Sequence, residues 1–483
     1  MAEQRPRLTS SSLSTAASTL AEMRRRDEGR DDGVRLKKKV GLVSGVALIV
    51  GTMIGSGIFV SPTDVAVGGG SVGFTLILWI ICGVISMCGA MAYAELGTMI
   101  NKSGAEYSYL LEAFGPLHST VGSIPAFLMV WTNTMLLKPA SVAIIMLTFA
   151  KYAMEPFYDQ CSASDGAQKC LAALGIIILT MVNCLSVRLA TGLQNVLTGA
   201  KLIAVVIIVI ACFVKLGQGS TAYLSSGFSG TNANIGQIAI GLYKGMWAYD
   251  GWNNLNYVTE ELSNPYVNLP RALMIGIPVV TLCYLLINIS YFTVMSVTEL
   301  VHSPAVAVTW SNRALGVVSW IIPLSIVCST FGAANGTLFS TGRLSYVAGR
   351  EGHMIELLSM IHVRKFTPMP SLILTALLSL LYVIPGDISS LINFFSFAVW
   401  FFYGGTMAAL LVLRYTQPDL TRPFKVPVVI PIIVLVIAVF LVIVPIATGP
   451  SLGYLFAFLF IISGFIFYIP FVHFEKYPAF MRE

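Results

Sequence analysis

A run of small residues interrupts the first apolar stretch of the chain. Residues 49–59 read Ile-Val-Gly-Thr-Met-Ile-Gly-Ser-Gly-Ile-Phe, so that Gly55, Ser56 and Gly57 fall in the middle of the stretch. Each glycine costs a helix about 1 kcal/mol relative to alanine. If the helix unwinds here, the backbone N–H groups that begin the next half-helix, together with its dipole, suit a carboxylate. Close helix packing through small residues is the alternative, and the motif alone does not decide between the two.

A second apolar stretch is interrupted at residues 246–254, which read Met-Trp-Ala-Tyr-Asp-Gly-Trp-Asn-Asn. A charged aspartate at the centre of a membrane helix costs at least about 2.5–3.5 kcal/mol, so Asp250 indicates a substrate or ion site. Trp247 lies three residues earlier and shares a face with Asp250 if the helix continues, where it could close over a ligand. The alternatives are an ion pair between Asp250 and an intramembrane lysine, and an ordinary packing role for Trp247.

Three lysines, Lys138, Lys201 and Lys244, also fall inside apolar stretches. Lys201 interrupts the sequence Ala-Lys-Leu-Ile, and a fixed ammonium there could replace a bound cation by holding neighbouring carbonyls and hydroxyls. The alternative is that the lysines extend toward a membrane surface, which suits Lys138 and Lys244 better than Lys201.

The sequence carries no catalytic set beside these residues. It contains no nucleophile elbow and no phosphate-binding loop, and its five histidines are scattered. Six of the eight cysteines lie in apolar stretches, while Cys161 and Cys170 lie in a polar loop, and no spacing suggests a metal site. We therefore expect no enzyme activity, no metal and no cofactor.

The composition places these residues in a membrane protein. Hydrophobic residues make up 56% of the 483 residues and charged residues only 11%, against about 25% charged residues in a soluble protein. Apolar stretches of about 20 residues, long enough to cross the hydrocarbon core, recur from residue 40 onward. We expect an all-α membrane protein of about twelve transmembrane helices, at residues 40–62, 72–97, 120–150, 167–187, 193–215, 234–256, 270–296, 312–342, 369–385, 388–413, 425–447 and 450–473.

Basic residues set the predicted orientation. Ten of the 29 lysines and arginines precede residue 40, and no cleavable signal peptide is visible, which indicates a cytoplasmic N-terminus. The inner loops then collect ten further basic residues, and the outer loops only Lys151, Lys169, Lys215 and Arg313. The prediction is a disordered cytoplasmic tail at 1–39, a transmembrane domain at 40–473 and a short cytoplasmic tail at 474–483.

The two interrupted stretches are the first and the sixth predicted spans. This separation is what two inverted repeats of five helices would give, with the site at their midplane. The position of the breaks is the sole basis for this five-plus-five (LeuT-like) prediction, which leaves two further helices at the C-terminus.

Three motifs resemble the L-type amino acid transporters, the light subunits of heteromeric transporters in the amino acid–polyamine–organocation superfamily. They are GSGIF in the first span, WAYDGWNNLNYVTEEL in the sixth, and GAANGTLFSTGRLSYVAGREGHM after the eighth. The resemblance covers about residues 40–473. Within the family, WAYDGWN, YVAGREGHM and IPGDI are most similar to members of the b(0,+) type.

The resemblance implies a twelve-helix transporter that exchanges amino acids one for one without sodium. Gly55, Ser56 and Gly57 would bind the substrate carboxylate, and carbonyls near Ile54 and of Trp247 would take the amino group. Trp247 would be an aromatic gate, and Asp250 would be the partner of the substrate's side-chain cation. Asn253 would brace the unwound helix, and Lys201 would replace sodium.

One position departs from the family pattern. Members that join a type II glycoprotein heavy chain carry a cysteine early in the loop after the third span, and Met154 occupies that place. Cys161 and Cys170 come later and could pair with each other, or one of them could substitute. A covalent heavy-chain link is therefore in doubt, and a non-covalent partner or none is possible.

The sequence favours a sodium-independent exchanger of cationic and neutral amino acids, including cystine, in the plasma membrane with both termini cytoplasmic. A carboxylate about 4 Å from a ligand ammonium contributes up to ~4 kcal/mol at an effective dielectric of 20, which supports Asp250 as the cation partner. Two alternatives remain open, a proton- or sodium-coupled symporter of neutral amino acids and a membrane sensor or interaction subunit without transport.

Overall fold

The computed structural model describes residues 40–100, 102, 104–118, 121–158, 164–303, 305–350, 352–362, 365, 367–448 and 452–474. Residues 1–39 and 475–483, where the sequence predicts tails, lie outside the described residues. The described chain is helical, and an isolated β-bridge joins Val40 to Leu262, beside a hydrogen bond of 2.9 Å from Ser263 N to Val40 O.

The first half of the chain forms eight α-helices. They are α2 (Leu42–Met53), α3 (Gly57–Gly69), α4 (Val72–Met99), α5 (Glu106–Phe114), α6 (Ile124–Thr132), α7 (Lys138–Met154), α8 (Asp165–Leu185) and α9 (Val187–Gly217). A π-helical turn, η2 (Asn133–Leu137), joins α6 to α7 without a break in the chain direction.

The second half continues in the same manner. Its elements are α10 (Ile235–Ala248), the 3-10 helix η5 (Asn254–Glu261), α11 (Pro265–Val294), α12 (Val297–His302), α13 (Val306–Ala314), α14 (Ile321–Arg350), α15 (Glu356–Ser359), α16 (Met369–Val383), α17 (Ile388–Thr416), α18 (Val429–Thr448), α19 (Leu452–Phe467) and the π-helix η7 (Tyr468–His473). Short 3-10 turns lie at Gly115–Leu117, Glu155–Phe157, Leu224–Ser226 and Gly316–Val318.

Nine helices within the described residues are long and apolar enough to cross a membrane, or ten if α2 and α3 form one bent span. Large apolar side chains are exposed along α8, α9, α18 and α19, as lipid contact requires. The all-helical membrane fold is therefore confirmed, with nine or ten of the twelve predicted spans. Of the remaining predicted spans, α10 has 14 residues and α16 has 15, so each is shorter than a full crossing.

The eighth predicted span, at 312–342, corresponds to the candidate span Gly316–Thr341, but its α-helix begins later than predicted. α13 ends at Ala314, a turn follows at Gly316 with φ of +58°, and α14 runs from Ile321 to Arg350. Apolar residues continue across this turn, so hydropathy alone places the start of the helix too early.

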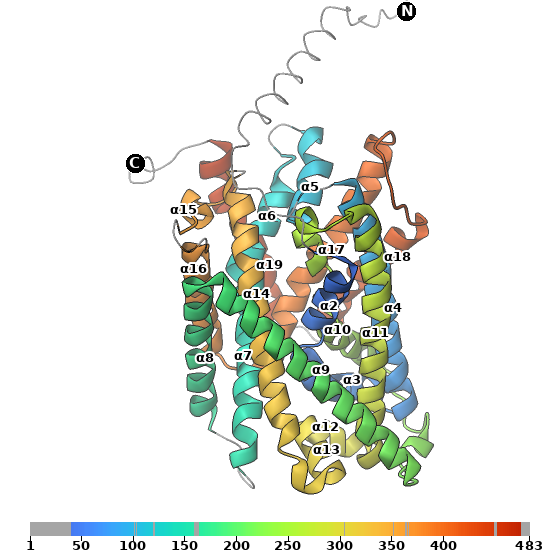
Figure 1. The fold of residues 1–483 in the computed structure, drawn as a ribbon. Coiled ribbons are helices and arrows are strands. Elements are labelled where there is room, and N and C mark those ends of the chain that lie inside the picture. The colour runs from blue at the N-terminus through green and yellow to red at the C-terminus, as the bar shows by residue number, and fades with distance from the viewer. Residues whose placement is uncertain are drawn as a thin grey trace, which may run out of the picture. The chain divides into compact units, whose positions relative to one another are not determined.

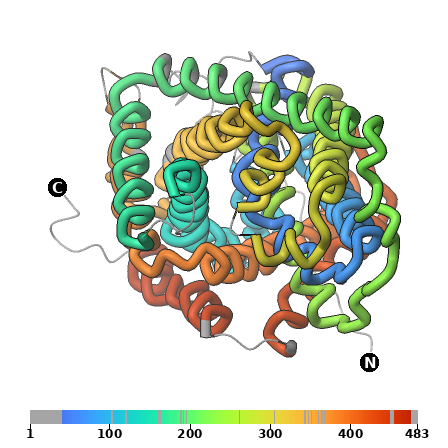
Figure 2. The backbone as a smooth tube through the Cα atoms, turned by 90° about the horizontal axis from the view of Figure 1, so that it is seen from below, coloured from blue at the N-terminus to red at the C-terminus, as the bar shows by residue number. Residues whose placement is uncertain are grey.

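The helices that carry the two interrupted stretches pack inside the bundle. α3 packs against α10, and a Cβ at Gly68 would lie 2.8 Å from the Cα of Gly241, so these backbones approach through glycines. Figure 2 shows α8 and α9 along the edge of the bundle, with α2 and α3 nearer its middle. Figure 1 shows α5 and α15 at one end of the bundle and α12 and α13 at the other.

Candidate functional site

A cavity of about 330 Å³ lies where the two interrupted stretches meet. Its walls come from the end of α2, the start of α3 and the turn after α10. Residues of α5, including Glu106, and of α6, η2, α7, α9, η5, α14 and α17 complete them. The volume suits a small molecule, and the walls combine apolar side chains with a few polar groups, which is typical of ligand sites. Six of the predicted site residues line it, namely Gly55, Ser56, Gly57, Trp247, Asp250 and Asn253.

The first stretch is broken at the predicted position. α2 ends at Met53, Ile54 leaves the helical conformation with φ −74° and ψ +83°, and α3 begins at Gly57. The axes of α2 and α3 differ by 55°. As at every helix start, the first N–H groups of α3 have no carbonyl of a preceding helical turn to donate to. Ser56 and Gly57, at this start, line the cavity.

The second stretch is broken after Ala248. Tyr249 ends α10, the chain turns through Gly251 with φ of +103°, and η5 begins at Asn254. Only glycine adopts this backbone conformation without strain. The turn is closed by two hydrogen bonds of 3.1 Å each, from Asp250 N to Trp247 O and from Asn254 N to Gly251 O.

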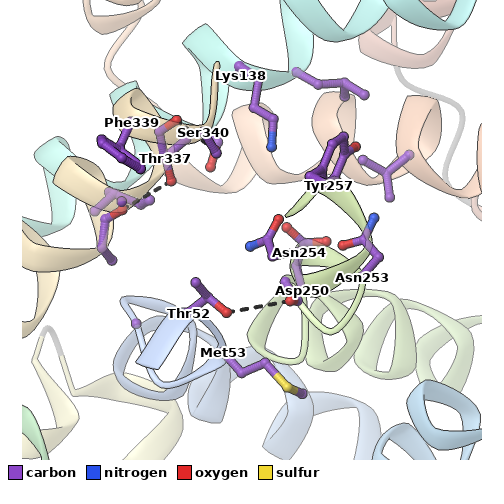
Figure 3. A pocket seen from close by; sticks show the side chains of 18 of the residues that line it. Thr52, Met53, Lys138, Asp250, Asn253, Asn254, Tyr257, Thr337, Phe339 and Ser340 are labelled. Carbon is purple, nitrogen blue, oxygen red and sulfur yellow. Dashed lines mark hydrogen bonds between the residues drawn. The ribbon is translucent and has the colours of Figure 1, made fainter. Parts of the chain in front are cut away.

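The two breaks are joined to each other. The hydroxyl of Tyr284, on α11, lies 2.5 Å from Met53 O and 2.8 Å from Ala248 O, within donating distance of the last carbonyls of α2 and α10. The Thr52 hydroxyl lies 3.4 Å from Gly251 O, and Figure 3 shows this contact across the two turns. The sequence analysis missed Tyr284, since nothing in an isolated tyrosine on a span indicates its contacts.

Lys201 holds the end of α2. Its ammonium donates hydrogen bonds to Gly51 O and, at 3.1 Å, to Ile54 O, and its side chain is 1% exposed. Lys201 and Ile54 therefore lie behind the cavity wall rather than on it. A lysine extended to a membrane surface would not be buried in this way, so the alternative reading fails for Lys201.

Asp250 lies at the cavity and forms no ion pair with a described residue. Its Oδ1 accepts a hydrogen bond of 3.0 Å from the hydroxyl of Tyr403, on α17. Lys138 lines the same cavity, and Figure 3 shows its ammonium directed into it. That ammonium lies 5.1 Å from the ring centroid of Tyr257 and forms no ion pair with Asp250.

Residues 40–467 match the model of the Amino acid permease family. The chain belongs to this family. It is 53% identical over 440 residues to the human b(0,+)-type amino acid transporter 1, covering 91% of this chain and 89% of that relative. It is 44% identical over 450 residues to the human cystine/glutamate transporter, covering 93% and 88%. The mouse large neutral amino acids transporter small subunit 2 is 44% identical over 421 residues, covering 86% and 78%.

Membership of the amino acid permease family makes this chain an amino acid transporter in a membrane, not an enzyme. The resemblance drawn from the motifs GSGIF, WAYDGWN and YVAGREGHM is confirmed. The roles of the individual site residues stay predictions.

Trp247 precedes Asp250 in the chain and Asn253 follows it, and both line the cavity. Trp247 is 7% exposed and packs edge-on against Phe395 at 4.7 Å between ring centroids. The Trp247 Nε1 has no hydrogen-bond partner within the described part of the chain. Asn253 donates its side-chain N–H to Glu106 Oε1, a residue that the sequence analysis did not single out.

Polar residues from three helices extend one wall of the cavity. Asn335, on α14, accepts a hydrogen bond of 2.8 Å from Asn183 and donates one of 3.0 Å to Gln194. Asn335 and Gln194 line the cavity, so this wall offers amides rather than charges.

Cys170 does not line this cavity. Cys170 is exposed on α8 with its thiol free, and Cys161 lies outside the described residues, so their predicted pairing stays a prediction. Met154 is the last residue of α7, at the place where the family pattern has a cysteine.

Proposed function

We propose that this amino acid permease is a sodium-independent exchanger of cationic and neutral amino acids, including cystine, that works by alternating access. We further propose twelve spans in the plasma membrane, arranged as five-plus-five inverted repeats and two additional helices, with both termini cytoplasmic. The observation that carries the proposal is Asp250, a carboxylate that forms no ion pair with a described residue, at a cavity between two broken helices.

The head of the substrate would bind between the breaks. Gly55, Ser56 and Gly57 would bind its carboxylate through backbone N–H groups, of which that of Gly55 donates to Met53 O at 2.8 Å in this structure. Carbonyls near Ile54 and that of Trp247 would accept from its ammonium, while Ile54 O itself accepts from Lys201 at 3.1 Å. Asp250 would meet the side-chain cation of arginine, lysine or ornithine, and Trp247 would close over the bound molecule. The proposed substrates accord with the names of the relatives, which include b(0,+)-type and cystine/glutamate transporters.

Independence from sodium is supported by Lys201. Its ammonium already contacts the carbonyls of Gly51 and Ile54, the kind of oxygens that would coordinate a sodium ion at a helix end. A heavy chain of the type II glycoprotein class stays a proposed partner, and Met154 speaks against a covalent link at the usual place.

The experiment is uptake of labelled arginine into proteoliposomes that hold the purified chain, in sodium-free buffer, with and without unlabelled leucine inside. Uptake that requires internal leucine is expected, and sodium should not increase it. Uptake without internal amino acid, or driven by a sodium or proton gradient, would favour the symporter instead. If nothing is transported, co-expression with a heavy chain distinguishes a missing partner from a chain without transport.

A further inference from the structure

Glu106 is a buried carboxylate that belongs to neither broken span. It is the first residue of α5, at one end of the bundle, and is 1% exposed. Its Oε1 accepts from the side-chain N–H of Asn253, and its Oε2 accepts from the hydroxyl of Tyr257 at 2.6 Å. Both donors follow the second break, so a helix distant in sequence holds the start of η5.

We propose that Glu106 is a positioning residue that fixes the turn after α10, and with it the shape of the substrate site. The inference rests on the proposed function, since the site in question is the one assigned to amino acids above. Asn253 lines the cavity three residues after Asp250, so displacement of Asn253 changes the wall that the substrate meets.

The geometry explains why a carboxylate is used. A carboxylate offers only acceptors, and here each oxygen meets one buried donor. Without those acceptors, two buried donors lose their partners, at about 1–3 kcal/mol each. The turn, which has few backbone hydrogen bonds of its own, would then move to satisfy them.

α5 is itself well anchored, which makes it a suitable reference for the turn. The hydroxyl of Tyr107 and Nδ1 of His353, both buried, lie 2.8 Å apart, and α5 packs against α6 and α17. Ala105, just before α5, has φ of +46° and ψ of −121°. A backbone conformation of this kind costs a non-glycine residue about 1–3 kcal/mol and persists only where surrounding contacts impose it.

The test separates the shape of Glu106 from its charge. In Glu106→Gln, the amide oxygen can accept from Asn253 while the amide N–H donates to the Tyr257 oxygen, so that both contacts survive without the charge. Glu106→Leu removes both contacts. Glu112→Leu is the matched control, since Glu112 lies on the same helix and pairs at 3.3 Å with exposed Lys102.

The measurement is exchange of arginine and of leucine in proteoliposomes, with KM and Vmax determined separately. We expect Glu106→Gln and Glu112→Leu to keep KM within about 3-fold of the parent, and Glu106→Leu to raise KM about 10-fold or more, the effect of one or two unpaired donors. The rise should be equal for the two substrates, because the turn serves the common amino acid head. Loss of transport in Glu106→Gln equal to that in Glu106→Leu would show that the charge matters and would overturn the proposal, as would normal exchange in Glu106→Leu.

A second readout needs no substrate. Asn254→Cys places a thiol at the half-buried start of η5, and its rate of reaction with a maleimide reports on the turn, with the chain lacking Asn254→Cys as background. Glu106→Leu should change this rate several-fold, and Glu106→Gln should not. An unchanged rate in Glu106→Leu contradicts the positioning role. If the parent transports neither arginine nor leucine, even when a heavy chain is co-expressed, the proposed function fails, and the labelling rates still decide the role of Glu106.

Discussion

Lys201 illustrates how a charge can be buried without a carboxylate. Its ammonium is held by two backbone carbonyls at the end of α2, where the helix dipole places partial negative charge. Hydrogen bonds that involve a charged group contribute about 1.5–3 kcal/mol each. The lysine therefore stabilises the unwound turn in which Ile54 and Gly55 lie.

Replacement of Lys201 by methionine should remove this stabilisation while the apolar stem is largely kept. We expect the folded protein to lose at least about 10-fold in the rate of arginine and leucine exchange alike, since the turn serves both substrates. Lys215→Met is the control, because Lys215 is half-buried in the last turn of α9 and does not line the cavity. Normal exchange in Lys201→Met would disprove the role of the ammonium.

At the scale of elements, the site depends on how closely α3 approaches α10. A Cβ at Gly57 would lie 2.4 Å from the Cα of Ala248, closer than two carbon atoms can approach without moving a backbone. Tyr284 then ties the ends of α2 and α10 together, so that the two breaks form one unit. The sequence alone does not decide whether the glycines unwind the helix or allow close packing. In the structure Gly57 lies at the break and also allows α3 to pack closely against α10.

Gly57→Ala should force α3 and α10 apart at the cavity. We expect exchange of every substrate to fall at least about 10-fold, whereas Gly199→Ala should leave it unchanged or stabilise the helix by up to ~1 kcal/mol. Gly199 lies on α9 with no atom within 4 Å of its added Cβ, which makes it the matched control. Equal behaviour of the two variants, measured as exchange rate per folded molecule, would contradict the close-approach argument.

At the scale of the whole molecule, a buried ion pair joins distant parts of the chain at one end of the bundle. Glu95, at 0% exposure on α4, pairs with Arg414 of α17 at 2.5 Å and accepts from Val426 N at 2.8 Å. Arg422 lies 3.8 Å from the same carboxylate. Loss of one partner of a buried pair is costly because the other charge stays buried, by about 3–5 kcal/mol.

Glu95→Gln should therefore lower the thermal unfolding temperature by several degrees in detergent. The half-exposed pair of Glu299 and Arg313, at 3.1 Å, gives the comparison, since such pairs contribute about 0–1 kcal/mol. We expect Glu299→Gln to shift the temperature little. Equal shifts for the two variants would show that the buried pair does not fasten these elements.

Much of this organisation could be predicted from the sequence. Hydropathy predicts the helices, since a bilayer requires long apolar segments. The glycines inside the first apolar stretch and Asp250 inside the sixth predict the two breaks. The contacts of Tyr284 and Glu106 could not be predicted, because their partners lie 36 to 231 residues away along the chain. From the sequence, extension to a membrane surface suits Lys244 better than Lys201. In the structure Lys244 is 2% exposed and donates to Ser389 O at 2.8 Å, because α17 covers it.

We propose above that Asp250 admits cationic amino acids to a site that also accepts neutral ones. The most direct measurement compares the exchange of arginine and of leucine by the parent and by Asp250→Gly in sodium-free proteoliposomes. Because the carboxylate would contribute up to ~4 kcal/mol to binding of a side-chain cation, Vmax/KM for arginine should fall at least about 10-fold, with leucine within about 3-fold of the parent. Equal losses for arginine and leucine would show that Asp250 shapes the site without selecting its substrate, and would contradict the account.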